Sequence, residues 1–351
     1  MSTSTPLKVL FIGGTGTISA SSVRLAAEQG MNIFVLNRGN NTRGRDLPDS
    51  VTWLTGDITR PDSVLEAIGS LEFDSVINFL SYNSDDAARA VTLFAGRTKQ
   101  YIHISTASMY HKPILQVPIV ESNLRANAYL EYARKKIDAE NTLMDANRES
   151  GFPVTIVRPS HTYDEASPPL AGGWTVIDRI ARGAEVVVHG DGTSLWTITH
   201  AADLAVGLVG LIGNPRAIGE DFNITSSDVY VWDQIIDIVA EALGTTARIV
   251  HIPSEFFPLA APDWGWSELM VGDLSHSAIF DTSKIRRYVP AFEPTHTFHR
   301  SVHGILEWRA DHPAESAVEP AVDDVFERLV KGYHESRKLF EALAPVAVSS
   351  K

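Results

Sequence analysis

The stretch Leu7-Lys-Val-Leu-Phe-Ile-Gly-Gly-Thr-Gly-Thr-Ile-Ser19 decides how this chain folds. It begins with an apolar run typical of a buried β-strand, passes through a glycine-rich turn and opens a helical segment. Glycine lets the backbone turn tightly and approach a pyrophosphate, and a helix N-terminus offers free N–H groups to phosphates. A purely structural turn is the alternative, but this context predicts a dinucleotide site with contacts from Gly13, Thr15, Gly16, Thr17 and Ile18.

Outward from this turn, short β-branched or aromatic runs alternate with longer helical patterns. The predicted strands are Lys8–Ile12, Asn32–Leu36, Val51–Leu54, Ser75–Phe79, Tyr101–Ile104 and Val154–Val157. The predicted helices between them are Thr17–Gln29, Arg60–Gly69, Asp85–Phe94 and Ala128–Glu149. Such alternation is typical of an α/β fold, here a Rossmann doubly wound parallel sheet with helices on both faces.

The amino-acid composition changes after Pro159, where a stretch rich in proline, glycine and serine begins. We expect residues 1–160 to form an NAD(P)-binding Rossmann domain and residues 161–351 a smaller substrate-binding lobe, interleaved with the first rather than independent. Glu185–His189 is a short apolar run in this lobe, and Val231–Leu243 is a predicted helix. The charged, amphipathic segment Glu319–Leu343 predicts a solvent-facing terminal helix, with a partner-binding role as the alternative.

Composition narrows the class of protein. The 351 residues are 44% hydrophobic and 21% charged, which is normal for a globular enzyme, and the formal net charge of −13 disfavours nucleic acid as a partner. The chain contains no cysteine, which excludes disulfides, thiolate metal sites and a cysteine nucleophile. A short polar N-terminus and the lack of a run of about 18 apolar residues predict a cytoplasmic protein without a membrane span. A homodimer is left open.

Asn37-Arg38 follows the second predicted strand, where many NAD-specific Rossmann proteins carry an acidic residue. A neutral residue removes the repulsion of a 2′-phosphate, and Arg38, with Arg43 or Arg45, is suited to bind that phosphate. NADP is therefore favoured over NAD, although Arg38 is equally suited to stack on adenine. Further expected cofactor contacts are Asp57 and Ile58 beside the adenine, Phe79 and Pro159; a helix cap is the alternative role of Asp57.

Tyr132-Ala-Arg-Lys-Lys136 places a phenol and an ammonium four residues apart on one face of a predicted helix. A phenol is a poor base at neutral pH, but nearby positive charges stabilise its phenolate. Tyr132 is then able to take a proton from an alcohol as hydride leaves, or to return it to a carbonyl. Two exposed helix residues are the alternative, and position in the chain favours the catalytic interpretation.

The fifth predicted strand ends in Ser105-Thr-Ala-Ser-Met-Tyr110, and at this point the sequence resembles the extended short-chain dehydrogenase/reductase superfamily, in the NAD-dependent epimerase/dehydratase family. The glycine turn and the Tyr-x-x-x-Lys pair match this family. So do, in the family's order, Arg158-Pro159, Gly190-Asp-Gly192, Asp203, Asp281-Thr-Ser-Lys284 and Trp308.

The resemblance implies roles for individual residues. Thr106 falls where the family places the catalytic Ser or Thr that hydrogen-bonds the substrate oxygen, with Ser105 and Ser108 as rivals. It implies that Lys136 also holds the nicotinamide ribose. Ser19 stands where the family usually has a third glycine, so we expect slightly looser packing of the first helix on its strand.

Departures from the family narrow the substrate. Ala107-Ser108 replaces the Asp-Glu pair of the dehydratases, which disfavours water elimination. Trp196 stands where epimerases place an arginine on the nucleotide diphosphate, and Ser160-His161 replaces a frequent asparagine. An unactivated sugar or sugar-like polyol is therefore favoured, with Ser108, His161, Trp174 and Trp196 as candidate substrate residues; ordinary core packing is the alternative for both tryptophans.

We expect no metal, because His111, His161 and His200 are scattered and nicotinamide chemistry needs none. The predicted function is redox chemistry at a secondary alcohol or ketone of a sugar-like substrate, as net dehydrogenation or as transient oxidation within an epimerisation. The alternatives are a nucleotide-sugar epimerase and a non-catalytic NADP-sensing or RNA-associated Rossmann protein. The retained Tyr-Lys pair and the acidic composition disfavour the last class.

Overall fold

The computed structural model describes residues 5–39 and 45–343 and is built around a seven-stranded sheet in the order β11-β6-β5-β4-β1-β2-β3. Each neighbouring pair of these strands runs parallel. The strands are β1 Lys8–Ile12, β2 Asn32–Asn37, β3 Thr52–Thr55, β4 Ser75–Asn78, β5 Tyr101–Ile104, β6 Val154–Pro159 and β11 Asp221–Ile224. The predicted Rossmann fold is confirmed.

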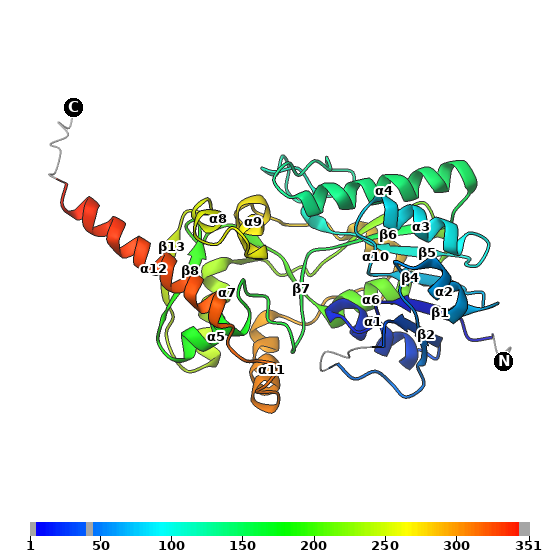
Figure 1. Ribbon diagram of the computed structural model, residues 1–351, viewed down its shortest axis with the longest axis horizontal. Helices are drawn as coiled ribbons and strands as arrows, with labels where there is room; N and C mark the ends of the chain where they lie inside the picture. The colour runs from blue at the N-terminus through cyan, green and yellow to red at the C-terminus, as the bar shows by residue number, and fades with distance from the viewer. Residues whose placement is uncertain (1–4, 40–44, 344–351) are drawn as a thin grey trace.

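Helices cover both faces of this sheet. Successive residues of a strand point to opposite faces, so Val9 and Phe11 enter one apolar core while Leu10 and Ile12 enter the other. Figure 1 shows α3 and α4 over one face and α1 and α6 over the opposite face. The helices are α1 Thr17–Glu28, α2 Pro61–Ile68, α3 Ser84–Phe94, α4 Glu131–Ser150 and α6 Ala201–Leu211.

The strand order reverses between β1 and β4, which lie side by side although two strands separate them in sequence. On either side of this point the chain leaves the sheet in opposite directions, and a crevice opens at the carboxyl ends of the strands. The glycine turn follows β1 and the segment from Phe79 follows β4, so both meet at this crevice.

A second lobe carries its own core and three short strand pairs. The strand β8 (Glu185–His189) pairs parallel with β13 (Arg248–Ile252), β9 (Leu195–Trp196) antiparallel with β12 (Tyr230–Val231), and β7 (His161–Tyr163) parallel with β10 (Ile198–His200). Its helices are α5 Trp174–Ala181, α7 Trp232–Ala242, α8 Phe256–Ala260, α9 Gly265–Leu269, a π-helical turn Met270–Leu274, α11 Phe298–Asp311 and α12 Pro320–Glu341. Figure 1 shows this lobe beside the sheet, beyond the ends of its strands.

The two lobes are interleaved in sequence. Beyond residue 160, β11 is a strand of the sheet and α6 packs in the core on one of its faces. The helix α10 (Ser283–Tyr288) packs against β11. Two single-turn 3₁₀ helices, Ala107–Met109 and Pro215–Ala217, complete the described elements. The amino-acid composition changes near residue 160, but a boundary there does not separate the cores of the two lobes.

The terminal helix α12 differs from the expected solvent-facing helix. Its first half packs on the second lobe, where Phe326 is buried and Glu327 accepts a hydrogen bond from the buried Arg179 at 2.8 Å. Its C-terminal end projects from the body of the molecule, with Leu339 and Phe340 exposed (Figure 1). Among the described residues, no helix is both long enough and apolar enough to span a membrane.

Candidate active site

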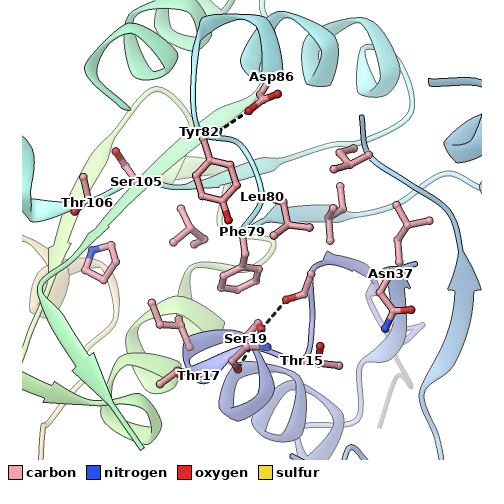
Figure 2. Close-up of a pocket in the computed structure, with 18 of the residues that line it drawn as sticks. Thr15, Thr17, Ser19, Asn37, Phe79, Leu80, Tyr82, Asp86, Ser105 and Thr106 are labelled. Carbon is pink, nitrogen blue, oxygen red and sulfur yellow. Dashed lines mark hydrogen bonds between the residues drawn. The ribbon is translucent and has the colours of Figure 1, made fainter. Parts of the chain in front are cut away.

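A cavity of about 750 Å³ opens at the crevice where the strand order reverses. Figure 2 shows the rings of Phe79 and Tyr82 pointing into it, between the glycine turn on one side and Ser105 and Thr106 on the other. Apart from Arg43 and Arg45, the residues expected to hold the cofactor line this cavity: Gly13, Thr15, Gly16, Thr17, Ile18, Asn37, Arg38, Asp57, Ile58, Phe79, Lys136 and Pro159.

The glycine turn has no room for side chains at its first two positions. Gly13 has a φ of +83°, and a Cβ there would lie 2.8 Å from Leu80 Cγ; a Cβ at Gly14 would lie 2.9 Å from a methyl group of Val35. The backbone can therefore come close to a ligand in the cavity.

Ser19 tightens the turn instead of loosening it. Its hydroxyl donates to the Gly13 carbonyl at 2.7 Å and accepts from the Gly16 amide at 2.8 Å, and the residue is buried. The expected looser packing at this position is not seen.

The N-terminus of α1 suits a pyrophosphate. The first amides of a helix lack intrahelical acceptors and carry partial positive charge, and the first turn of α1 contains no acidic residue. Together with a backbone cradle that side chains would fill, this donor set fits the diphosphate of a dinucleotide. The residues present thus fit NAD(P).

Of the residues expected to contact the adenosine half of the cofactor, some line the cavity and one is engaged elsewhere. Asn37 and the exposed Arg38 line the cavity. Arg45 is buried in a two-pronged ion pair with Asp164, at 2.5 and 2.8 Å, so it is not available in the way we expected for a 2′-phosphate. Arg43 lies outside the described residues.

Asp57 lines the cavity, but it is not the helix cap considered as its alternative role, because Arg60 is the residue that precedes α2. Its carboxylate accepts from the amide and the hydroxyl of Thr59 at 2.9 and 2.8 Å. These hydrogen bonds lower the pKa of Asp57.

Tyr132 and Thr106 lie together at the inner end of the cavity. Tyr132 is the second residue of α4, and 43% of its side chain is exposed, to the open cavity. Removal from bulk water, with smaller effects of Tyr82 and Asp273, raises the pKa of Tyr132 to about 12, against the lowering effect of a hydrogen bond with the Thr106 side chain. This hydrogen bond favours Thr106 over its rivals as the hydroxyl that works with Tyr132.

The rivals Ser105 and Ser108 also line the two cavities, but no hydrogen bond joins either of them to Tyr132 within the described part of the chain. Ser105 is buried at the end of β5, and the Ser108 hydroxyl accepts from Thr106 at 3.1 Å and lies farther in.

Lys136 is buried one turn further along α4. Its ammonium donates to the carbonyls of Ser81 and Ile104 at 2.6 and 2.7 Å, which leaves one of its three protons for another acceptor. Burial lowers the pKa of Lys136 to about 8, against the opposing effect of Glu140 and Asp86. The lysine is thus fixed at the cavity wall with its charge only partly compensated.

Tyr82 is a site residue that sequence reasoning missed. Its ring lies 5.1 Å from the Lys136 ammonium and lines the same cavity, and its amide is held by Asp86 at 2.9 Å. Its position just beyond the end of β4 is the signal that would have pointed to it, because the carboxyl ends of these strands surround the crevice.

A second, inner cavity of about 260 Å³ continues from the first. The two cavities share Tyr132, Ser160 and Thr162. Three of the four predicted substrate residues, Ser108, His161 and Trp196, line it. Trp174 does not: it stacks on Trp308 at 5.4 Å, and this position does not support the expected stacking on substrate.

The inner cavity is aromatic and nearly free of charge. His161 contacts Trp196 and Trp266, with ring centroids 6.3 and 5.7 Å apart, and burial lowers the pKa of His161 to about 4, so it is neutral at pH 7. Within the described residues, the lining contains no arginine or lysine. Trp266, Asp273 and Phe280 were not predicted, because they come from a late segment without a motif.

Proteins of known sequence and structure resemble this chain over most of its length. It is 25% identical over 290 residues to the 2'-dehydrokanamycin reductase of Streptomyces kanamyceticus, which covers 82% of this chain and 80% of that protein. It is 24% identical to the chloroplast stem-loop binding protein of 41 kDa b of Arabidopsis thaliana, over 73% of this chain and 69% of that protein. The epimerase Mth375 of Methanothermobacter thermautotrophicus shares its fold, with a TM-score of 0.73 and 16% identity over 89% of this chain and 94% of that one.

Residues 9–225 match the family described as NAD dependent epimerase/dehydratase. The matched region runs from β1 to the end of β11, so it contains the glycine turn, Thr106 and the Tyr132–Lys136 pair. The chain therefore belongs to the NAD dependent epimerase/dehydratase family, of the extended short-chain dehydrogenase/reductase type.

Proposed function

We propose that this protein transfers hydride between NAD(P) and a secondary alcohol or ketone of a sugar-like ring substrate, with Tyr132 as the proton-transferring group. The observation that carries the proposal is the junction of the two cavities. A cavity suited to a dinucleotide and a smaller aromatic cavity share Tyr132, so the phenol borders both the cofactor and the substrate space.

In an alcohol oxidation, Thr106, Tyr132 and Lys136 have different roles. When bound, the nicotinamide ring supplies the hydride acceptor. Thr106 donates or accepts a hydrogen bond at the substrate oxygen, and Tyr132, as phenolate, takes the hydroxyl proton. Lys136 directs its remaining N–H toward the cavity, where its positive charge favours the phenolate. In the reducing direction the proton returns from Tyr132 to the carbonyl oxygen.

An unactivated substrate is favoured over a nucleotide sugar. A diphosphate calls for arginine or lysine, and the inner cavity places Trp196 and His161 on its wall instead. A volume of about 260 Å³ accommodates one ring, below the range of roughly 300–1,000 Å³ typical of larger ligands.

A thermal-shift screen with NADP⁺ present tests this substrate class. We expect free sugars and cyclic polyols to raise the melting temperature and, for the substrate itself, to generate NADPH. Strong stabilisation by UDP- and dTDP-sugars alone would overturn the proposal.

The cofactor preference is a separate proposal that rests on Asn37 and Arg38 at the cavity edge. We expect NADP⁺ to bind more tightly than NAD⁺ in calorimetric titrations, because a guanidinium pairs with the 2′-phosphate. NAD⁺ binding tighter by tenfold, about 1.4 kcal/mol, would contradict it.

Retention of the cofactor separates the two modes of action. An epimerase has to keep its reduced cofactor until the keto intermediate is reduced again, whereas a dehydrogenase exchanges it. Nicotinamide that stays with the protein through gel filtration therefore favours epimerisation, and nicotinamide that is lost favours net dehydrogenation.

A further inference from the structure

A buried carboxylate without an assigned role faces the inner cavity. Asp273 lies on the π-helical turn Met270–Leu274 of the second lobe and is only 5% exposed. It lines the inner cavity together with Tyr132 and His161, and its negative charge raises the pKa of both side chains, which shows that it lies within electrostatic reach of them. A π-helical turn often marks a functional position.

The turn that carries Asp273 is fixed to the catalytic segment. The Asn127 side chain donates to the carbonyls of Ser108 and Gly272 at 2.7 and 2.8 Å and so joins the two. Gly272 allows the close approach, because a Cβ there would lie 2.7 Å from Tyr129 Cβ. The carboxylate thus keeps a defined position relative to the start of α4.

Lys112 compensates the charge of Asp273 from behind the cavity wall. Its ammonium lies 2.7 Å from Asp273 Oδ1, both side chains are buried, and Lys112 is not among the lining residues. Despite this ion-pair contact, Oδ1 makes no hydrogen bond within the described part of the chain. Oδ1 is enclosed and faces Lys112, so a ligand does not reach it. No hydrogen bond to the second oxygen, Oδ2, is found in the described part of the chain, and Asp273 lines the cavity, so Oδ2 is the oxygen with acceptor capacity for a ligand.

The rest of the wall combines flat rings with the neutral polar side chains of Ser108, Ser160, His161 and Thr162. The indole N–H of Trp196 is used by the Leu274 carbonyl at 2.8 Å, so Trp196 presents only its ring. Trp266 and Phe280 add further apolar surface. A ring with an apolar C–H face and a hydrogen-bond donor matches such a wall.

Because Lys112 already balances the charge of Asp273, the cavity favours an uncharged hydrogen-bond donor on the bound ring. An anionic substituent would meet the carboxylate in a space with little water. An ammonium group would add a second cation near Lys112, whose own charge already balances Asp273 and lies 5.9 Å from the Trp196 ring centroid. A hydroxyl group satisfies the free acceptor without adding a charge.

We infer that the inner cavity binds an uncharged cyclic polyol and that Asp273 accepts a hydrogen bond from a hydroxyl group other than the one that reacts. This inference rests on the proposed function and makes Asp273 the residue that sets the preference for a second hydroxyl. Under this inference the second lobe recognises the substrate, whereas the residues that take part in the reaction, Tyr132 and Thr106, lie on α4 and just after β5.

The probes are cyclohexanol, the cyclohexanediols and myo-inositol, with trans-2-aminocyclohexanol and 2-hydroxycyclohexanecarboxylate as charged analogues. Calorimetry with saturating NADP⁺ measures binding, and NADPH absorbance measures turnover. We expect at least one diol or myo-inositol to bind at least tenfold more tightly than cyclohexanol and both charged analogues. Equal binding of diols and cyclohexanol, tightest binding of a charged analogue, or no binding of any probe would overturn the inference.

The double variant Lys112→Met/Asp273→Leu tests the residue, because it removes the acceptor oxygens and leaves no unpaired buried charge. We expect the preference for the polyol over cyclohexanol to fall to within about twofold, while calorimetric NADP⁺ affinity stays at the wild-type value. The matched control is Lys99→Met/Asp74→Leu, the same change at a surface pair, where the preference is expected to persist.

A preference that survives in the Lys112/Asp273 variant would overturn the role of Asp273. Polyol binding that depends on Asp273 but produces no NADPH would instead leave the inference standing and count against the proposed hydride transfer.

Discussion

Tyr132 and Lys136 lie in surroundings that disfavour the charged form of each side chain. Burial raises the pKa of Tyr132 to about 12 and lowers that of Lys136 to about 8. At pH 7 the phenol is therefore neutral and the ammonium remains mostly charged. Positive charge next to the phenol favours its ionisation, so the oxidised cofactor and Lys136 both act in the direction that an alcohol oxidation needs.

Replacement of Tyr132 by phenylalanine should abolish turnover while leaving the affinity for the cofactor nearly unchanged. The variant keeps the ring but loses the hydroxyl that transfers the proton, a contribution of about 10²–10⁴-fold. The expected phosphate contacts come from the glycine turn and the start of α1, not from α4, which carries Tyr132. Steady-state rates with an active substrate and calorimetric titration with NADP⁺ measure the two effects.

Lys136→Ala is the contrasting variant for the same prediction. Here rate and cofactor affinity should fall together, and stability should fall too, because the buried carbonyls of Ser81 and Ile104 lose their donor, at about 1–3 kcal/mol for each group left unpaired. Thermal unfolding separates this cost from the loss of affinity. Near-normal turnover in Tyr132→Phe would show that the proton donor lies elsewhere.

At the residue scale, the sequence revealed those site residues whose geometry is local. The spacing of Tyr132 and Lys136 places them on one helix face whatever the rest of the fold does, and the glycine turn is contiguous. Asp273 and Tyr82 escaped prediction because their place in the site depends on how distant segments pack. Trp174 was expected beside the substrate, but the choice between stacking on Trp308 and facing the cavity depends on α11 and is not encoded near Trp174.

The unit β1–turn–α1 is held together by Ser19 where a glycine is usual in the family. The hydroxyl bridges the Gly13 carbonyl and the Gly16 amide, so it closes the turn from the helix side. A third glycine would permit close packing but supply neither hydrogen bond. The turn thus gains rigidity from the residue that seemed to weaken the motif.

Ser19→Ala should therefore lower both stability and cofactor affinity. Two hydrogen bonds at about 0.5–1.5 kcal/mol each are lost, and the phosphate-binding amides lose their fixed orientation. We expect a lower melting temperature and a several-fold higher Kd for NADP⁺. Ser22→Ala is the matched control: its buried hydroxyl donates to the Ile18 carbonyl at 2.9 Å on the same helix, but Ser22 does not line the cavity. Equal loss of affinity in both variants would contradict the role of Ser19.

Element boundaries show where local patterns end and tertiary contacts begin. Periodicity predicted a helix from Ala128, whereas α4 begins at Glu131. The reason is Asn127, whose side-chain carbonyl accepts from the amides of Tyr129 and Leu130 at 2.9 and 3.2 Å and holds the chain in a turn. The short strands β9 and β12 were not predicted, because two residues carry no period and their pairing joins segments far apart in sequence.

Across the described part of the molecule, burial favours the uncharged form of four histidines: His103, His161, His189 and His276. Burial lowers the pKa of His103 well below its ordinary value and lowers that of His161 and His189 to about 4. In the unfolded chain each returns to a pKa near 6.5. Below pH 6.5 the unfolded chain therefore binds protons that the folded chain does not, so the stability present above pH 6.5 is lost as the pH falls toward 4.

The free energy of unfolding should consequently decrease from pH 6.5 to 4, by up to about 1.4 kcal/mol per pH unit for each histidine. Carboxylates with a lowered pKa, such as Glu165 at about 2, add to the loss mainly at more acidic pH. His103→Leu should make the decline shallower, by up to about 1.4 kcal/mol per pH unit. Both ring nitrogens of His103 lack hydrogen-bond partners among the described residues, so the substitution removes no hydrogen bond. Urea unfolding at half-unit pH intervals measures the slope. His303→Leu, at an exposed position, is the matched control, and equal slopes in wild type and His103→Leu would show that His103 takes up its proton in the folded protein.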